Sequence, residues 1–259
     1  METKTTTAAA ETDGANPDPG SDLVQRGREQ RLMLDVAGYE EAVPLLREAI
    51  ELAPADAPAY AELSLTYSYW GFRRENACLG FQREIHMLEF QSLYDMAYDY
   101  AGMALRLAPE LGASHLAMAA ALRRGAKADP ERRAREALLA VEFDPENPEA
   151  VCERWRVQGY DPKDPQVRAA LEKEPRLIAV RIDLAAAMCE RGWYDDAFAE
   201  LEKARQIAPS YIQVYYELAM ILDRKGMRRK AVEVLQKARG LRPEDPLLKQ
   251  GFALLGETP

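Results

Sequence analysis

The chain has 259 residues, of which 47% are hydrophobic, and its formal net charge is −9. A negative field repels phosphate backbones, which argues against nucleic acid as a partner. Three well-separated cysteines without a CxxC pair argue against a zinc-finger or thioredoxin-type site, and they favour a reducing compartment.

The chain begins with a polar stretch that has no apolar centre. Residues 1–21 are rich in Thr, Ala, Asp and Pro, so we predict a disordered leader rather than a secretory signal peptide. The longest apolar run, Leu116 to Leu122, is too short to cross a bilayer. We therefore expect a cytoplasmic protein that does not enter a membrane.

The first predicted pair of helices spans residues 23–56. It is expected to contain a polar helix over 23–36, a turn at Gly38 and Tyr39, and a second helix over 40–52.

The second predicted pair, over 57–111, carries the main irregularity of the chain. Roughly 20 residues more than a compact pair needs lie at 72–93, and their apolar spacing is typical of a helix. These residues either lengthen the second helix of the pair or form a separate insert.

Further helical segments follow at regular intervals. They are predicted over 112–147, 148–176 in shortened form, 177–210, 211–244, and a capping helix over 245–256. Asp129-Pro130 and Asp164-Pro165 each combine a capping carboxylate with a ring whose φ is already fixed, and they predict helix starts.

Two of these segments repeat each other. The landmarks of the first return after about 34 residues in the second. The matching residues are Leu184-Ala185 and Leu218-Ala219, Gly192 and Gly226, Ala197 and Ala231, Leu201 and Leu235, Ala204 and Ala238, and Pro209 and Pro243. In these residues the chain resembles the tetratricopeptide-repeat family, and the resemblance extends over most of the chain.

The resemblance implies an all-α fold. Residues 22–259 would form a right-handed α-solenoid of stacked helix-turn-helix repeats with a C-terminal capping helix. Small residues would let the two helices of a hairpin approach closely, and larger ones would fill the gap to the next hairpin. The first helix of each hairpin would line the concave side.

Motifs for catalysis, phosphate binding or metal binding are missing from the sequence. No HExxH, GxxxxGK[ST] or GxSxG pattern occurs, and the two histidines, His86 and His115, lie far apart. We therefore predict no catalytic residue, no cofactor and no metal site, and we expect that the chain is not an enzyme.

Basic clusters at helix ends have a structural explanation. The cations before Gly125, Gly192 and Gly226 meet the negative end of a helix dipole, and the glycine that follows forms the cap. The run Arg228 to Lys230 opens a helix, where cations are mildly unfavourable, and is a better functional candidate.

In one branch of the family, Lys, Asn and Arg on the concave helices clamp the terminal carboxylate of a chaperone peptide. The matching positions here lack that clamp and include Glu62, Asp183 and Glu217. The resemblance therefore implies that this chain does not bind chaperone tails.

The same concave positions predict an apolar strip that binds a partner. It comprises Leu65, Tyr69, Leu116, Ala120, Ile182, Ala186, Tyr216 and Met220. The acidic flanks suit an amphipathic helix or an extended segment with apolar anchors and basic flanks. Tyr216 and Ile182 are the expected anchors, and Trp70 and Trp155 are further aromatic residues that repeat packing does not explain. Alternatively, the strip packs against the leader, the 72–93 segment or a second copy of the chain.

These features together predict a non-enzymatic scaffold or adaptor for a protein or peptide partner. Two alternatives stay open: a homo-oligomeric structural protein that self-associates through 72–93, and a regulatory subunit of an enzyme complex.

Overall fold

The structure, a computed structural model, describes residues 19–77 and 86–257, so most of the expected leader and the middle of the 72–93 segment lie outside it. Thirteen α-helices and no β-strand occupy the described residues. They form six successive pairs and one last helix. The pairs are α1 (Pro19–Arg31) with α2 (Val36–Leu52), α3 (Ala57–Ala77) with α5 (Met87–Leu107), α6 (Gly112–Ala121) with α7 (Pro130–Phe143), α8 (Pro148–Val157) with α9 (Pro165–Lys173), α10 (Ile178–Glu190) with α11 (Tyr194–Ile207), and α12 (Ile212–Arg224) with α13 (Arg228–Leu241), followed by α14 (Pro246–Leu254).

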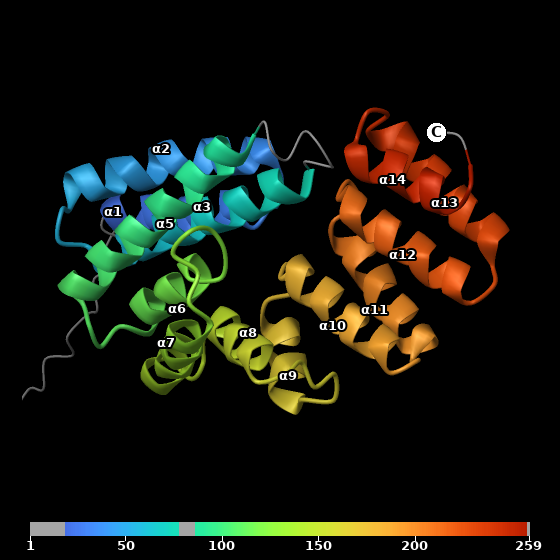
Figure 1. The fold of residues 1–259 in the computed structure, drawn as a ribbon. Coiled ribbons are helices and arrows are strands. Elements are labelled where there is room, and N and C mark those ends of the chain that lie inside the picture. The colour runs from blue at the N-terminus through green and yellow to red at the C-terminus, as the bar shows by residue number, and fades with distance from the viewer. Residues whose placement is uncertain (1–18, 78–85, 258–259) are drawn as a thin grey trace, which may run out of the picture.

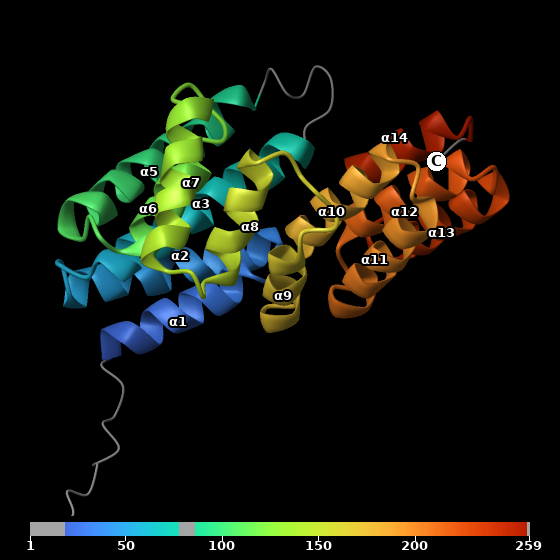
Figure 2. The ribbon, with the colours of Figure 1, turned by 90° about the horizontal axis from the view of Figure 1, so that it is seen from below.

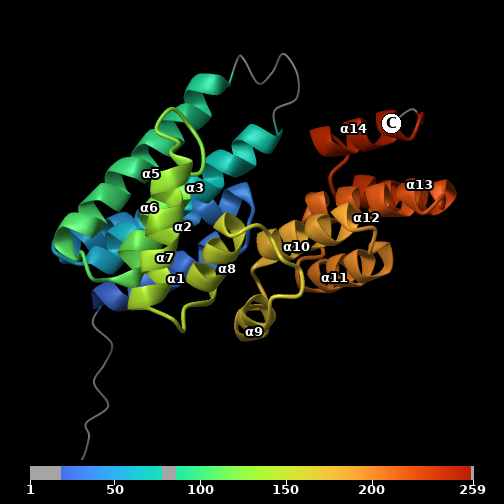
Figure 3. The same cartoon turned by 60° about the horizontal axis from the view of Figure 1, so that its bottom comes forward.

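The pairs stack in chain order into a right-handed α-solenoid, which confirms the predicted fold class (Figures 1 and 2). First helices of neighbouring pairs contact one another, as α3 does with α6, α6 with α8, and α10 with α12, and we call their shared surface the inner wall. The last helix, α14, packs on α12 and α13 and covers the end of the stack (Figure 3).

As the repeat pattern predicts, alanines pack between the two helices of a pair, and leucines pack between neighbouring pairs. Ala185 and Ala197, one from each helix of a hairpin, are 1% and 0% exposed, and Ala219 is fully buried in the next hairpin. Leu201 and Leu218 are also fully buried between hairpins. Burying a leucine side chain stabilises the fold by about 2 kcal/mol, so a hairpin gains most of its stability from its neighbours.

The second pair is longer than the others because both of its helices are extended. Helices α3 and α5 have 21 residues each. Their extended ends are joined by an ion pair of 3.1 Å between Arg74 and Glu89 and by a hydrogen bond of 2.7 Å from the Tyr94 hydroxyl to Glu75. The described part of 72–93 thus lengthens both helices, and residues 78–85 lie outside the described chain.

The turn of the first pair lies earlier than predicted. The sequence suggested Gly38 and Tyr39, but α2 already begins at Val36, and the Asp35 carboxylate caps it by accepting a hydrogen bond of 2.8 Å from the Gly38 N–H. Gly38 serves close packing instead, because a Cβ there would lie 2.5 Å from the carbonyl oxygen of Gln30. A glycine in a helical hairpin therefore gave a misleading turn signal.

Leu34 occupies the left-handed position of this turn. Its φ is 59°, and it lies two residues before α2, just as Gly192 (φ 76°) and Gly226 (φ 73°) lie two residues before α11 and α13. A leucine in this conformation costs about 1 kcal/mol relative to glycine. Its side chain is 6% exposed, and together with Leu32 it packs into the core formed by α8 to α12. The strained residue therefore carries a contact that glycine could not make.

Candidate partner-binding surface

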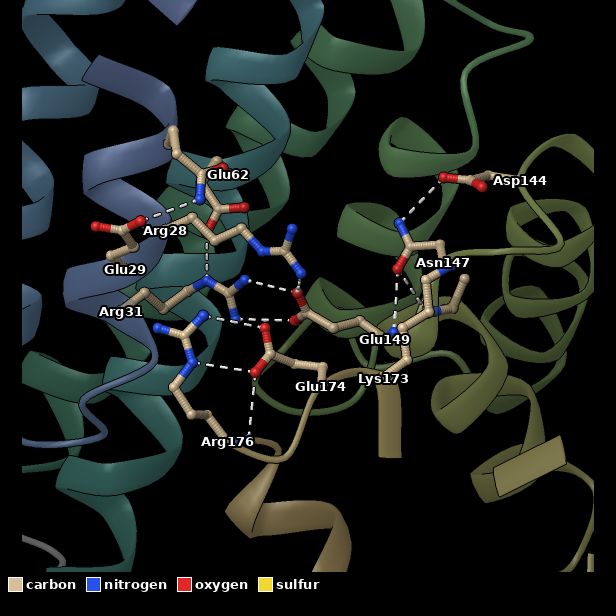
Figure 4. A network of polar contacts seen from close by, with 12 residues as sticks. Arg28, Glu29, Arg31, Glu62, Asp144, Asn147, Glu149, Lys173, Glu174 and Arg176 are labelled. Carbon is tan, nitrogen blue, oxygen red and sulfur yellow. Dashed lines mark hydrogen bonds and ion pairs between the residues drawn. The ribbon is translucent and has the colours of Figure 1, made fainter. Parts of the chain in front are cut away.

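The N-terminal half of the inner wall is closed by the chain itself. Arg31, at the end of α1, is 1% exposed and reaches Glu149 on α8 with two hydrogen bonds of 2.9 and 3.0 Å. It also donates to Glu62 on α3, and Arg28 contacts Glu149 at 3.1 Å (Figure 4). The end of α1 therefore joins the first, second and fourth pairs from the inside.

Burial and pairing act in opposite directions on the two carboxyls around Arg31. Burial raises the pKa of Glu62, although Arg31 acts to lower it. Burial would also raise the pKa of Glu149, but the charges and hydrogen bonds of Arg31 and Arg28 outweigh it and hold that pKa below its usual range. Glu149 is thus the main counter-charge of the buried guanidinium.

A second buried network continues along the inner wall toward the C-terminus. The Glu153 carboxylate accepts hydrogen bonds of 2.6 and 2.8 Å from Arg133 and one of 3.3 Å from Arg156. Arg156 also donates to Asp183 on α10 at 2.7 Å, and Arg123 lies 3.9 Å from the same carboxylate. Guanidinium groups thus connect the turn after α6 with α7, α8 and α10, across the junction between the fourth and fifth pairs.

The four N-terminal members of the predicted strip do not form an open surface. Leu65 and Leu116 are each 3% exposed and belong to the core of the first three pairs. Tyr69 is half-buried, with the Arg31 guanidinium 5.4 Å from its ring centre. Ala120 is half-buried against the same core as Leu65. The expectation that Leu65 and Leu116 line a free groove is corrected, because both are buried in the core, and Tyr69 and Ala120 are partly covered by the chain's own side chains.

The four C-terminal members of the strip come together in one depression. It has a volume of about 450 Å³ and lies between α10, α12 and α14; we call it the C-terminal hollow. Its walls include Ile182, Ala186, Tyr216 and Met220, with Leu254 from α14 at the rim. Ala186 is exposed, Tyr216 and Met220 are half-buried, and Ile182 is 7% exposed.

The rim of the C-terminal hollow is mainly acidic. Glu190, Glu217 and Asp223 contribute to its walls, against a single arginine, Arg224. Burial raises the pKa of Glu217, while a hydrogen bond from Gln213 and the charge of Arg224 act to lower it. The hollow thus combines apolar walls with negative charge, and of the three acids predicted to flank the strip only Glu217 lies in it.

Two features of the structure, one in the C-terminal hollow and one on α8, escaped the sequence analysis. Leu254 is 58% exposed. The sequence did not assign it to the hollow, because the capping helix was predicted from the apolar residues on its opposite, buried face.

Trp155, which the sequence analysis did not explain by packing, is 1% exposed and donates a hydrogen bond of 2.8 Å to the carbonyl of Asp161. It closes the turn of the shortened pair and is a core residue.

One residue of the basic run Arg228 to Lys230, at the start of α13, has a structural role. Arg228 donates a hydrogen bond to the Leu255 carbonyl at the end of α14, so it helps to hold the capping helix. Arg229 is 94% exposed and pairs with Glu233 one turn away. This run lies outside the C-terminal hollow.

Side chains that could carry chemistry are engaged in structural contacts. Both ring nitrogens of His115 have partners, Glu136 at 2.7 Å and the Pro109 carbonyl at 2.8 Å. Cys152 is buried, and Cys189 is half-buried. Within the described residues no group of three or more His, Cys, Asp or Glu side chains could hold a metal ion. None of the described helices has the length and apolarity needed to span a membrane.

Comparison with known proteins identifies the repeat. Residues 190–255, from the end of α10 to the end of α14, match the family model described as tetratricopeptide repeat. No curated protein sequence matches the chain.

Several solved structures share the fold. The human IFIT1 dimer with m7Gppp-AAAA has a TM-score of 0.63 at 15% identity, and the match covers 90% of this chain and 52% of that one. A chain of the APC/C hetero-tetramer Cut9-Hcn1 has a TM-score of 0.62 at 15% identity, covering 92% and 45%. PilW, described as a widely conserved type IV pilus biogenesis factor, has a TM-score of 0.55 at 14% identity, covering 89% and 97%.

The present chain spans about half the length of the IFIT1 and Cut9-Hcn1 chains. At these identities the likeness concerns the fold alone. The tetratricopeptide-repeat model thus matches residues 190–255, and the solved structures show that the fold of the whole chain is that of tetratricopeptide-repeat solenoids.

Proposed function

We propose that this chain is a non-enzymatic protein–protein interaction scaffold, and that the C-terminal hollow receives an apolar segment of a partner protein. The observation that carries the proposal is the difference between the two halves of the inner wall. In the N-terminal half, Leu65 and Leu116 are buried and the end of α1 lies against α3 and α8, whereas in the C-terminal half exposed Ala186 and half-buried Tyr216 and Met220 line a hollow of about 450 Å³.

The size and lining of the hollow fit a few side chains of a peptide or helix. A volume of about 450 Å³ lies within the range of binding pockets in proteins. Half-buried Tyr and Met side chains are typical contact residues, because tyrosine offers a large surface at a low cost in ordering and methionine adapts its shape to the partner. The acidic rim favours a partner with basic residues beside its apolar anchors.

The charge of the hollow distinguishes this proposal from nucleic-acid binding. The human IFIT1 structure of similar fold is described with m7Gppp-AAAA, but Glu190, Glu217 and Asp223 would repel the phosphates of such a ligand here. The partner is therefore proposed to be a protein. The cytoplasmic location and the absence of enzymatic activity stay predictions from the sequence.

The proposal is tested by blocking the hollow without disturbing the core. Ala186 is exposed, so an Ala186→Arg variant fills the hollow and weakens its negative charge. The matched control is Ala199→Arg, which places the same side chain on an exposed position of α11 in the same hairpin. Tagged full-length chains would be used for affinity capture from cells of the source, followed by mass spectrometry.

We expect the wild-type and Ala199→Arg chains to retain the same proteins, and Ala186→Arg to lose them. An Ala186→Arg chain that folds and retains the same proteins in the same amounts would contradict the proposal.

One observation favours self-association as a second candidate function. Met87 and Leu88, at the start of α5, are 55% and 79% exposed and lie within the 72–93 segment. Static light scattering of the purified chain separates the two hypotheses. A monomer at micromolar concentration supports the scaffold, and a dimer that a Met87→Ser, Leu88→Ser variant abolishes supports self-association.

A further inference from the structure

Four carboxylates occupy the same position on four first helices. Counted from the first residue of α3, α8, α10 and α12, the sixth residue is Glu62, Glu153, Asp183 and Glu217, respectively. The equal spacing places these four acids at one register of the inner wall.

Three of these acids bind guanidinium groups of the chain itself. Glu62 accepts from Arg31, Glu153 from Arg133 and Arg156, and Asp183 from Arg156. Each of these contacts is made by arginine, and lysine makes none of them. A planar guanidinium matches the two oxygens of a carboxylate, and it loses less hydration than an ammonium group when buried.

The fourth acid, Glu217, has no guanidinium ion-pair partner among the described residues. Among the described residues no cation forms an ion pair with it, and its side chain interacts with the uncharged amide of Gln213. Arg224 lines the same hollow without forming an ion pair with Glu217. Burial raises the pKa of the half-buried Glu217 carboxyl, and the hydrogen bond from Gln213 and the charge of Arg224 only partly offset this effect.

We infer that Glu217 receives an arginine from the partner, and that the partner segment carries this arginine next to apolar residues that enter the C-terminal hollow. The inference rests on the proposed function and specifies the chemistry that the hollow recognises. The chain contains an example of such a segment: Arg31 is followed by Leu32 and Leu34, and all three side chains are buried against the inner wall.

The experiment is a selection of random displayed peptides on the full-length chain. Four versions of the chain are compared: wild type, Glu217→Gln, Ala186→Arg, and the control Glu172→Gln, which removes an exposed acid of α9. Circular dichroism and thermal unfolding establish that each variant is folded. One selected peptide is then synthesised with arginine and with citrulline, which keeps the shape of arginine and removes its charge, and the affinity of each form for the wild-type chain is measured.

We expect peptides selected on wild type and on Glu172→Gln to be enriched in arginine over lysine beside apolar residues. On Glu217→Gln the preference for arginine should disappear, while the apolar preference should persist. Citrulline should weaken binding to the wild-type chain by about tenfold or more, because charge-assisted hydrogen bonds are lost.

The inference and the proposed function fail in different ways. The inference alone is overturned if Ala186→Arg abolishes peptide binding, so that an open hollow is required, but the peptides tolerate citrulline. It is also overturned alone if such peptides keep their arginine preference on Glu217→Gln. If no selected peptide is lost on Ala186→Arg, the proposed function fails, and the inference fails with it.

Discussion

At the scale of single residues, Leu34 shows how this chain accepts backbone strain in order to bury a side chain. Glycine would relieve about 1 kcal/mol at φ 59°, but deleting a buried leucine side chain costs about 2–5 kcal/mol. We therefore expect Leu34→Gly to lower the free energy of unfolding by about 1–4 kcal/mol, measured by urea denaturation. Met33→Gly is the control, because Met33 is 62% exposed in the same turn, and it should cost less than about 1 kcal/mol. A stabilised Leu34→Gly chain would show that the side chain contributes nothing.

The stability of the chain should depend strongly on Arg31. Arg31→Met leaves Glu149 and Glu62 buried without their shared cation, and breaking a buried pair costs about 3–5 kcal/mol. The control, Arg26→Met, removes an arginine whose pair with Asp22 is more than half exposed, and it should change stability by less than about 0.5 kcal/mol. Equal unfolding midpoints for the two variants would contradict the account of the network.

The acid stability of the chain should depend on Glu153. Burial would raise its pKa, but Arg156 and Arg133 outweigh burial and hold the pKa below its usual range. A carboxyl with a lowered pKa in the folded state stabilises the fold above its unfolded pKa of about 4.3, and this contribution disappears as the pH falls through the folded pKa.

Stability should therefore decrease as the pH is lowered below about 4, and Glu153→Gln should show a smaller decrease than wild type. Urea denaturation between neutral pH and pH 3 measures this. The exposed control Glu172→Gln should follow the wild-type curve, and an unchanged acid limb in Glu153→Gln would refute the assignment.

At the scale of elements, two glycines allow the effect of turn geometry on stability to be measured separately from the effect of helix propensity, because an added Cβ has space at both. A Cβ on Gly226 or on Gly240 would meet nothing within 4 Å, but only Gly226 has a positive φ, of 73°. Gly226→Ala should destabilise the chain by about 1 kcal/mol through strain, and Gly240→Ala should stabilise it by up to about 1 kcal/mol, because alanine favours a helix interior. Thermal unfolding of both variants tests this, and shifts of the same sign would contradict it.

The elements were predictable where the signals are local. The helices that begin at Pro130 and Pro165 start where the sequence placed them, because Asp129 and Asp164 cap them with hydrogen bonds of 2.9 and 2.8 Å. The first pair was misplaced, since its turn contains Leu34 in a glycine conformation, which no local pattern indicates.

For the candidate site, the sequence predicted which positions face the inner wall, but not which of them are accessible. The repeat spacing identified inner-wall positions, and it found Ala186, Tyr216 and Met220 correctly as neighbours. It could not indicate that Leu65 and Leu116 are covered, because the end of α1 is held against α8 by Arg31 and Glu149, which are 118 residues apart. Closure of the inner wall is a property of the folded chain rather than of one repeat.

At the scale of the whole molecule, the solenoid has two unequal halves. The α1–α2 turn contributes Leu32 and Leu34 to the core that joins the fourth and fifth pairs, so the N-terminal pair supports the C-terminal pairs from the inside. The largest cavity that the described residues form between first helices is then the C-terminal hollow, of about 450 Å³. A partner is expected to bind there and to leave the first three pairs unchanged.

Hydroxyl-radical footprinting tests this central claim most directly, because methionine and tyrosine side chains report their own accessibility. The full-length chain is oxidised with and without a captured partner or a selected peptide. We predict that the oxidation rates of Met220 and Tyr216 fall several-fold on binding, while those of Met33 and Met87, which are 62% and 55% exposed, do not change. Protection of Met33 or Met87 with Met220 and Tyr216 unaffected would contradict the account.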